Sequence, residues 1–141
     1  MYDPVMVQPM RQELTSIGFK ELKTAQEVDE AMGNAKGTSL LLVNSVCGCA
    51  AGQARPGVAL ALTGSVVPEN LFTVFAGQDT EATAQARSYI HGYPPSSPSM
   101  TIFKDGEVVE MIERYQIENH NAEQVAAKLT EAFQKYCMSN N

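Results

Sequence analysis

Two apolar stretches along the chain are too short for buried helices, and both are predicted to be buried strands. Thr38–Asn44 reads Thr-Ser-Leu-Leu-Leu-Val-Asn, and Leu71–Ala76 reads Leu-Phe-Thr-Val-Phe-Ala. Short apolar runs without polar alternation are typical of strands that are covered on both faces. We therefore expect Thr38–Asn44 at the centre of a sheet, with a further short strand at Phe19–Leu22.

Between these strands, apolar residues recur at the three- and four-residue spacing of helices. The helices predicted in this way are 5–17, ended by Gly18; 24–35, begun by a Thr24–Glu27 capping box; 50–62, kinked at Pro56; 79–90, capped by Asp79; and a last helix capped by Asn121. The polar tail from Met138 is expected to fray.

The last strands are predicted to form a hairpin. Met100–Lys104 and Glu107–Ile112 flank Asp105-Gly106, a pair of residues that favours a two-residue turn between antiparallel strands. Residues 92–98, which include three prolines, cannot continue a helix and must form an ordered loop. The order of elements predicts one α/β domain over residues 1–141, with parallel strands early and a hairpin late.

Composition and charge narrow the class of protein. At 141 residues the chain can bury one core, and its net charge of −6 disfavours nucleic acids and anionic membranes as partners. Met1–Met10 does not read as a signal peptide, and no apolar run approaches the roughly 20 residues that cross a bilayer. We therefore expect a cytoplasmic protein, in which three cysteines do not form a disulfide scaffold.

Cys47 and Cys49 stand where the central strand ends and a helix begins. The amide groups and partial positive charge of a helix N-terminus stabilise a thiolate, which is the reactive form of cysteine. A disulfide across one intervening residue would be strained, although Gly48 relieves part of that strain, and strain favours an oxidant or isomerase over a structural bridge. We expect Cys47 to attack a substrate disulfide and Cys49 to resolve the product.

Other interpretations of the two cysteines stay open at this point. They could pack as small buried residues, or they could begin a zinc or copper(I) site. Further soft ligands are few, since His91, His120 and Cys137 are distant in sequence, and we expect Cys137 to be a bystander. A Cys-x-Cys motif alone is weak evidence for any of these functions.

Residues 44–56, which read Asn-Ser-Val-Cys-Gly-Cys-Ala-Ala-Gly-Gln-Ala-Arg-Pro, resemble the bacterial bacilliredoxin family. The resemblance extends to residues 9–19, 94–99 and 117–118. It implies a thioredoxin-like three-layer α/β sandwich with a mixed central sheet and an extra N-terminal helix. It also implies an enzyme that removes bacillithiol from mixed disulfides on cytosolic proteins.

The same resemblance implies roles for individual residues. Cys47 accepts the bacillithiol group and Cys49 forms the intramolecular disulfide, with bacillithiol as co-substrate and no bound cofactor. Pro98 aligns with the proline that thioredoxin-like folds place in cis opposite the active cysteine, and Ser97 before it offers its backbone to a substrate strand. Disulfide isomerase activity is the alternative within the same class of enzyme.

Two features leave the mechanism incomplete. The strand Leu40–Asn44 carries no carboxylate, so the buried acid that assists proton transfer in thioredoxin has no counterpart there. Arg55 is either a contact for the carboxylates of bacillithiol or a solvated helix residue. A thiolate metal-binding protein without turnover remains the alternative of a different class.

Overall fold

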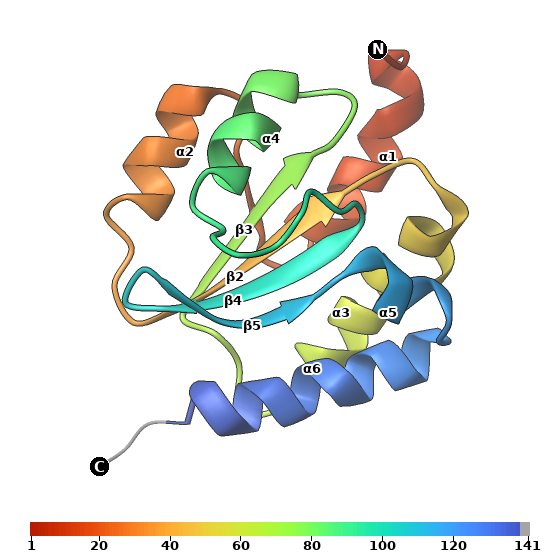
Figure 1. Ribbon diagram of the computed structural model, residues 1–141. Coiled ribbons are helices and arrows are strands. Elements are labelled where there is room, and N and C mark those ends of the chain that lie inside the picture. Colours follow the sequence, from red (N-terminus) through yellow and green to blue (C-terminus); the bar gives the residue numbers. More distant parts are fainter. Residues whose placement is uncertain (139–141) are drawn as a thin grey trace.

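The computed structural model describes residues 1–138 and consists of a five-stranded sheet between two layers of helices (Figure 1). The strands are β1 (Lys20–Glu21), β2 (Thr38–Asn44), β3 (Asn70–Phe75), β4 (Ser99–Lys104) and β5 (Glu107–Ile112). The helices are α1 (Pro4–Thr15), α2 (Ala25–Met32), η1 (Ala50–Ala54), α3 (Arg55–Ala61), α4 (Thr80–Arg87), α5 (Arg114–Glu118) and α6 (Ala122–Tyr136). The end of the predicted frayed tail, residues 139–141, lies outside the described residues.

Strand β2 lies at the centre of the sheet, as the sequence predicts. The strand order is β1-β3-β2-β4-β5. Strands β1, β3 and β2 run parallel, β4 is antiparallel to β2, and β5 is antiparallel to β4. All seven residues of β2 are buried. The predicted hairpin is confirmed, because Asp105 and Gly106 take the positive φ angles that a tight two-residue turn requires.

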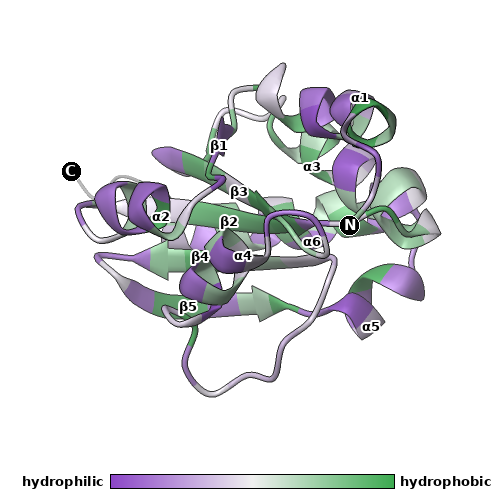
Figure 2. Ribbon diagram, turned by 90° about the horizontal axis from the view of Figure 1, so that it is seen from above, coloured by the Kyte–Doolittle hydropathy of each residue, from purple (hydrophilic) through white to green (hydrophobic). Residues whose placement is uncertain are grey.

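The two faces of β2 feed two separate hydrophobic clusters. Leu40 and Leu42 pack with α1, α3 and α6, whereas Leu41 and Val43 pack with α2 and α4. In Figure 2 the central strands are coloured largely hydrophobic, and the helices carry hydrophilic as well as hydrophobic residues. Burying each such side chain contributes about 1.5–3 kcal/mol, so the position of β2 is strongly determined.

Several predicted helix ends are wrong by a few residues. Helix α2 ends at Met32 and α4 ends at Arg87. In both places the backbone leaves the helix earlier than the spacing of apolar residues predicts. Thr24 caps α2 as predicted, but the Glu27 carboxylate accepts from the backbone of Lys23 rather than from Thr24.

The predicted helix over residues 50–62 is two helical segments. Residues Ala50–Ala54 are π-helical and continue without a break into the α-helical residues Arg55–Ala61, so Pro56 stands in the first turn of α3 and inside a longer helical stretch. Proline carries no amide hydrogen to donate to the preceding turn, and the π-helical turn that ends just before it is where the helix departs from α geometry. Short π-helical turns are frequent at functional sites.

Asp79 does not cap α4 with its side chain, because Arg11 takes up its carboxylate. The Nη1 and Nη2 atoms of Arg11 lie 2.7 and 3.1 Å from the two carboxylate oxygens of Asp79, and Nη1 lies 3.0 Å from Glu21. Hydrogen bonding to Asp79 raises the pKa of Arg11 against the opposing effect of burial, and Glu21 adds to the rise. This buried network joins α1, β1 and the start of α4.

No helix within residues 1–138 combines the length and the apolar character needed to cross a membrane. The two-layer covering of the sheet instead gives every described helix an apolar face to bury against a strand or another helix. The longest of them, α6, packs Leu129 and Phe133 into the core.

Replacing the buried arginine tests the network. Arg11→Leu leaves Asp79 and Glu21 as neighbouring carboxylates without their buried partner, and we expect the free energy of unfolding to fall by about 3 kcal/mol. Lys23→Gln is the matched control, because exposed Lys23 pairs with the same Glu21 at 3.5 Å. That substitution should cost less than about 1 kcal/mol. Urea denaturation measures both, and equal losses would contradict the account.

Candidate active site

The cysteine pair lies at the turn between β2 and the π-helical segment η1. Strand β2 ends at Asn44, and the first helical hydrogen bonds run from the amides of Ala50 and Ala51 to the carbonyl oxygen of Cys47, at 3.1 and 3.2 Å. Cys47 therefore begins the helical turn. The predicted placement of the pair, directly after the central strand and at the start of a helix, matches the structure.

The two sulfur atoms are close to each other and are partly buried. The Sγ atoms of Cys47 and Cys49 lie 3.0 Å apart as free thiols, and either thiol is able to donate. The hydroxyl of Ser45 donates to the Sγ of Cys47 at 3.2 Å. Ser45 itself is buried, so this hydroxyl has little competition from water.

These contacts shift the pKa values of the two thiols in opposite directions. Partial burial opposes ionisation of Cys47, but hydrogen bonds from the Cys49 thiol, the Ser45 hydroxyl and the amides of Ala50 and Cys49 together hold the pKa of Cys47 below its ordinary value. Burial raises the pKa of Cys49, and so do the hydrogen bond to Cys47 and the negative charge of that neighbour. Cys47 is therefore the more acidic of the two cysteines, and the Cys49 thiol can donate to its sulfur.

Arg55 holds the end of β2 in place. It is neither the solvated helix residue nor the ligand contact that the sequence suggested. Only 3% of it is exposed, so it is not a solvated helix residue. Its Nη1 donates to the side-chain oxygen of Asn44 and to the carbonyl oxygen of Ser45, both at 2.9 Å, while its Nε donates to Glu13 at 2.9 Å. With these partners Arg55 is committed to the protein interior and does not offer its guanidinium to a ligand.

The Ser97–Pro98 segment reaches the same end of the sheet as the cysteines. Val43 pairs with Ser99, so the residues just before β4 lie beside the residues just after β2. The Ser97–Pro98 peptide bond is cis, as the family resemblance implies. Pro98 is buried and Ser97 is partly exposed.

Helix α5, which the sequence did not predict, lies between this segment and the cysteine turn. Arg114 donates from its backbone to the hydroxyl of Ser96 at 2.7 Å and from Nη1 to the carbonyl oxygen of Ser97 at 3.2 Å. On the other side, the side chain of Gln53 in η1 donates to the carbonyl oxygen of Glu118 at 3.3 Å. The positive charge of Arg114 also lowers the pKa of Cys49, although burial dominates that pKa.

Sequence reasoning missed Ser45 and Arg114. The hairpin gives a signal for Arg114, since β5 returns antiparallel to β4 and pairs Ile112 with Met100. A residue two positions beyond Ile112 must therefore lie near the residues just before β4. No comparable pattern marks Ser45, because its role depends on the turn between β2 and η1.

The remaining cysteine and histidines lie apart from this site. Cys137 lies near Thr38, the first residue of β2, which is at the opposite end of that strand from Cys47. His91 lies in the loop after α4, and Nδ1 of His120 lies 2.6 Å from the carbonyl oxygen of Gln116 in α5. Within residues 1–138 no three His, Cys, Asp or Glu side chains are grouped so as to hold a metal ion.

Comparison with solved structures identifies the fold. Thioredoxin O2 from Arabidopsis thaliana superimposes with a TM-score of 0.57 at 16% sequence identity, covering 87% of this chain and 97% of that one. Thioredoxin from Malassezia sympodialis gives a TM-score of 0.55 at 12% identity, covering 86% and 92%. The fold is thus thioredoxin-like, with α1 as the N-terminal helix that the resemblance implied.

Comparison of sequences identifies the family. Residues 2–137 match a family model described as disulphide isomerase. A bacilliredoxin from Koribacter versatilis is 52% identical, covering 97% of this chain and 94% of that protein. One from Symbiobacterium thermophilum is 57% identical over 90% of both chains, and one from Staphylococcus aureus is 50% identical over 97% and 94%. From these matches and from its Cys-Gly-Cys turn, the chain belongs to the bacilliredoxin family.

Proposed function

We propose that this thiol-disulfide oxidoreductase removes bacillithiol from mixed disulfides on other proteins, with Cys47 as nucleophile and Cys49 as resolving thiol. Family membership and the thioredoxin-like fold support the class of enzyme. The observation that carries the assignment of roles is the hydrogen bonding at Cys47, whose sulfur accepts from Ser45 and lies 3.0 Å from the Cys49 sulfur. The relatives named bacilliredoxin suggest the substrate.

In the first step the Cys47 thiolate attacks the bacillithiol sulfur of the mixed disulfide. The bond between Cys47 and bacillithiol forms as the bond between bacillithiol and the client breaks, and the client sulfur leaves as a thiolate that takes a proton from water. Cys47 is oxidised to a mixed disulfide and the client cysteine is reduced. The exchange needs no external oxidant, because Cys47 gains the disulfide bond that the client cysteine loses.

In the second step Cys49 attacks the Cys47 sulfur and releases bacillithiol. The hydrogen bond to Cys47 and the charge of its thiolate both raise the pKa of Cys49, and both are lost once Cys47 is part of a mixed disulfide. The charge of Arg114 then favours the Cys49 thiolate. The first step therefore prepares the second. Two molecules of free bacillithiol, acting as a reducing co-substrate, then return the Cys47–Cys49 disulfide to the dithiol and leave as bacillithiol disulfide.

We assign substrate binding to Ser97 and Pro98 from their place at the cysteine end of the sheet, next to the pairing of Val43 with Ser99. S-bacillithiolated proteins are the proposed partners, and the cytoplasm, where thiols are kept reduced, is the proposed compartment. The net charge of −6 argues against nucleic acid or an anionic membrane as a partner. No resident cofactor takes part in this scheme.

Disulfide isomerisation is the second candidate, because the matching family model is described as disulphide isomerase. The same Cys47 thiolate would then attack a protein disulfide. Rates on one client carrying bacillithiol and on a scrambled disulfide-bonded protein decide between the two. We expect thiol removal to be at least ten-fold faster, and faster isomerisation would favour the second candidate.

Substitution of each cysteine tests the roles. Cys47→Ser should release no thiol from a bacillithiolated client, because the nucleophile is gone. Cys49→Ser should release about one equivalent of client thiol and then turn over only with added bacillithiol. Cys137→Ser, at the opposite end of β2, should match the unchanged protein. If Cys47→Ser stays active while Cys49→Ser does not, the assigned order of attack is wrong.

The pH dependence of alkylation tests the hydrogen bond from Ser45. The alkylation rate of Cys47 should fall as the pH falls through its lowered pKa, because protonation removes the thiolate. Ser45→Ala removes a donor to that thiolate, so the midpoint of the profile should move to higher pH. Ser65→Ala, an exposed loop residue, is the control. Iodoacetamide labelling followed by peptide mass spectrometry gives the profile, and an unmoved midpoint for Ser45→Ala would refute this role.

A further inference from the structure

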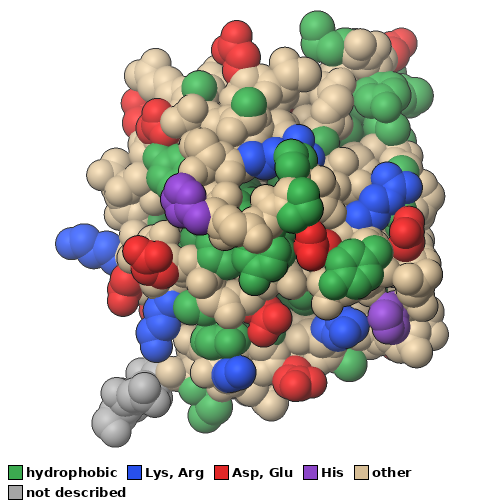
Figure 3. Space-filling model, viewed as in Figure 1, with side chains coloured by type: hydrophobic (Ala, Val, Ile, Leu, Met, Phe, Trp, Pro, Cys, Tyr) green, Lys and Arg blue, Asp and Glu red, His purple; other side chains and the backbone are tan. Residues whose placement is uncertain are grey.

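An open groove lies beside the cysteine pair, between the Pro95–Ser97 segment and α5. Its volume is ≈ 540 Å³, which falls within the range of roughly 300–1,000 Å³ of small-molecule sites. The end of α4, the Pro95–Ser97 segment and the residues from Glu113 through α5 line it. In the view of Figure 3, basic side chains lie close to a hollow in the surface that is edged by hydrophobic groups.

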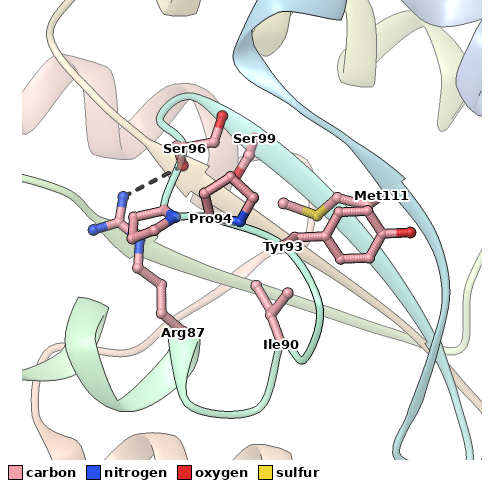
Figure 4. A pocket seen from close by; sticks show the side chains of 8 residues that line it. Arg87, Ile90, Tyr93, Pro94, Ser96, Ser99 and Met111 are labelled. Carbon is pink, nitrogen blue, oxygen red and sulfur yellow. Dashed lines mark hydrogen bonds between the residues drawn. The ribbon is translucent and has the colours of Figure 1, made fainter.

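Two arginines line this groove, and one segment of backbone anchors both. Arg114 donates from Nη1 to the carbonyl oxygen of Ser97 at 3.2 Å, and Arg87 donates from Nη2 to the carbonyl oxygen of Ser96 at 3.3 Å. Figure 4 shows the Arg87 guanidinium held against Ser96 in this way. Consecutive carbonyl groups thus position two guanidinium groups along a single groove.

Arg87 has few partners within the protein itself. In the described part of the chain, Arg87 forms no ion pair, and its Nε is buried without a hydrogen-bond partner. Burial lowers the pKa of Arg87, which is the effect expected of a guanidinium that lacks a carboxylate nearby. The arrangement leaves a positive charge that an anionic ligand would stabilise.

The acidic residues of the groove are already engaged or weakly held. The Glu113 carboxylate accepts from a backbone amide in the first turn of α5. Glu118 pairs with Nε of Arg114 at 3.2 Å, but both side chains are nearly half exposed. A pair of this kind on one helix contributes only about 0.3–0.5 kcal/mol, so an incoming carboxylate can share or displace it.

We propose that this groove binds the carboxylate end of the low-molecular-weight thiol, with Arg114 and Arg87 as its charged contacts. The inference rests on the proposed function, in which the thiol is bacillithiol, whose malate group carries two carboxylates. Each arginine keeps one terminal nitrogen outside the hydrogen bonds described above, Nη1 of Arg87 and Nη2 of Arg114, and a charged N–H group donates strongly to a carboxylate. With its carboxylates in the groove, the thiol directs its sulfur toward the neighbouring cysteine turn.

Two mixed disulfides of one client protein test this site. One carries bacillithiol and the other carries mercaptoethanol, which has no carboxylate. We expect Arg114→Gln to lower kcat/KM about ten-fold for the bacillithiol disulfide, mainly through KM, since a charged hydrogen bond is worth about that factor. The loss on the mercaptoethanol disulfide should be several-fold smaller, because only the effect of the Arg114 charge on the cysteines remains there. Arg87→Gln should act in the same direction, and malate should inhibit the unchanged protein competitively.

Comparing the two disulfides distinguishes failure of the proposed binding site from failure of the proposed function. Arg114 also acts on the charge of the cysteines, but that effect applies equally to both substrates, so an equal loss on both would overturn the proposed site. Lys104→Gln removes an exposed positive charge at the opposite end of the sheet and should leave both rates unchanged. If the unchanged protein reduces the mercaptoethanol disulfide but not the bacillithiol one, the proposed function fails. Thermal unfolding verifies that each variant is folded.

Discussion

The buried guanidinium of Arg55 fixes the point at which the central strand ends and the reactive turn begins. It donates to the side chain of Asn44 and to the backbone of Ser45, and it pairs with Glu13 from α1. The side chain of Asn44 in turn donates to the backbone of Met10 at 3.2 Å. Helix α1, strand β2 and helix α3 therefore meet at one set of hydrogen bonds, and the position of Ser45 beside Cys47 depends on them.

The different acidities of Cys47 and Cys49 follow from the different hydrogen-bond partners of their sulfur atoms. Cys47 receives donors from a side chain and from backbone amides, whereas Cys49 serves as a donor and is held in its neutral form. Because the two sulfurs share one hydrogen bond, ionisation of one suppresses ionisation of the other. No carboxylate is needed to hold this difference, which accounts for a buried β2 without an acidic residue.

Much of the fold could be predicted from the sequence, because it depends on local patterns. The apolar run of β2, the Asp105-Gly106 turn and the Asn121 cap each determine structure within a few residues, and all are confirmed. The cysteine turn was predicted on the same basis. What the sequence did not reveal depends on partners distant in the chain.

Three residues illustrate that limit. Asp79 reads as a helix cap, yet its carboxylate binds Arg11, which lies 68 positions earlier in the chain. Arg55 reads as a surface residue, yet it is buried because Glu13 and Asn44 satisfy its charge and donors. Arg114 reads as a residue after a strand, and only the pairing of β5 with β4 carries it to the Ser97 backbone. In each case a long-range ion pair or hydrogen bond overrides the local pattern.

The chemical identity of the group transferred to Cys47 tests the account most directly. Intact-mass spectrometry of the Cys49→Ser protein, taken shortly after mixing with a bacillithiolated client, identifies that group, because the resolving thiol is absent. The account predicts a mass increase equal to one bacillithiol, located on Cys47. An adduct with the client protein itself, or bacillithiol bound to a cysteine other than Cys47, would contradict it.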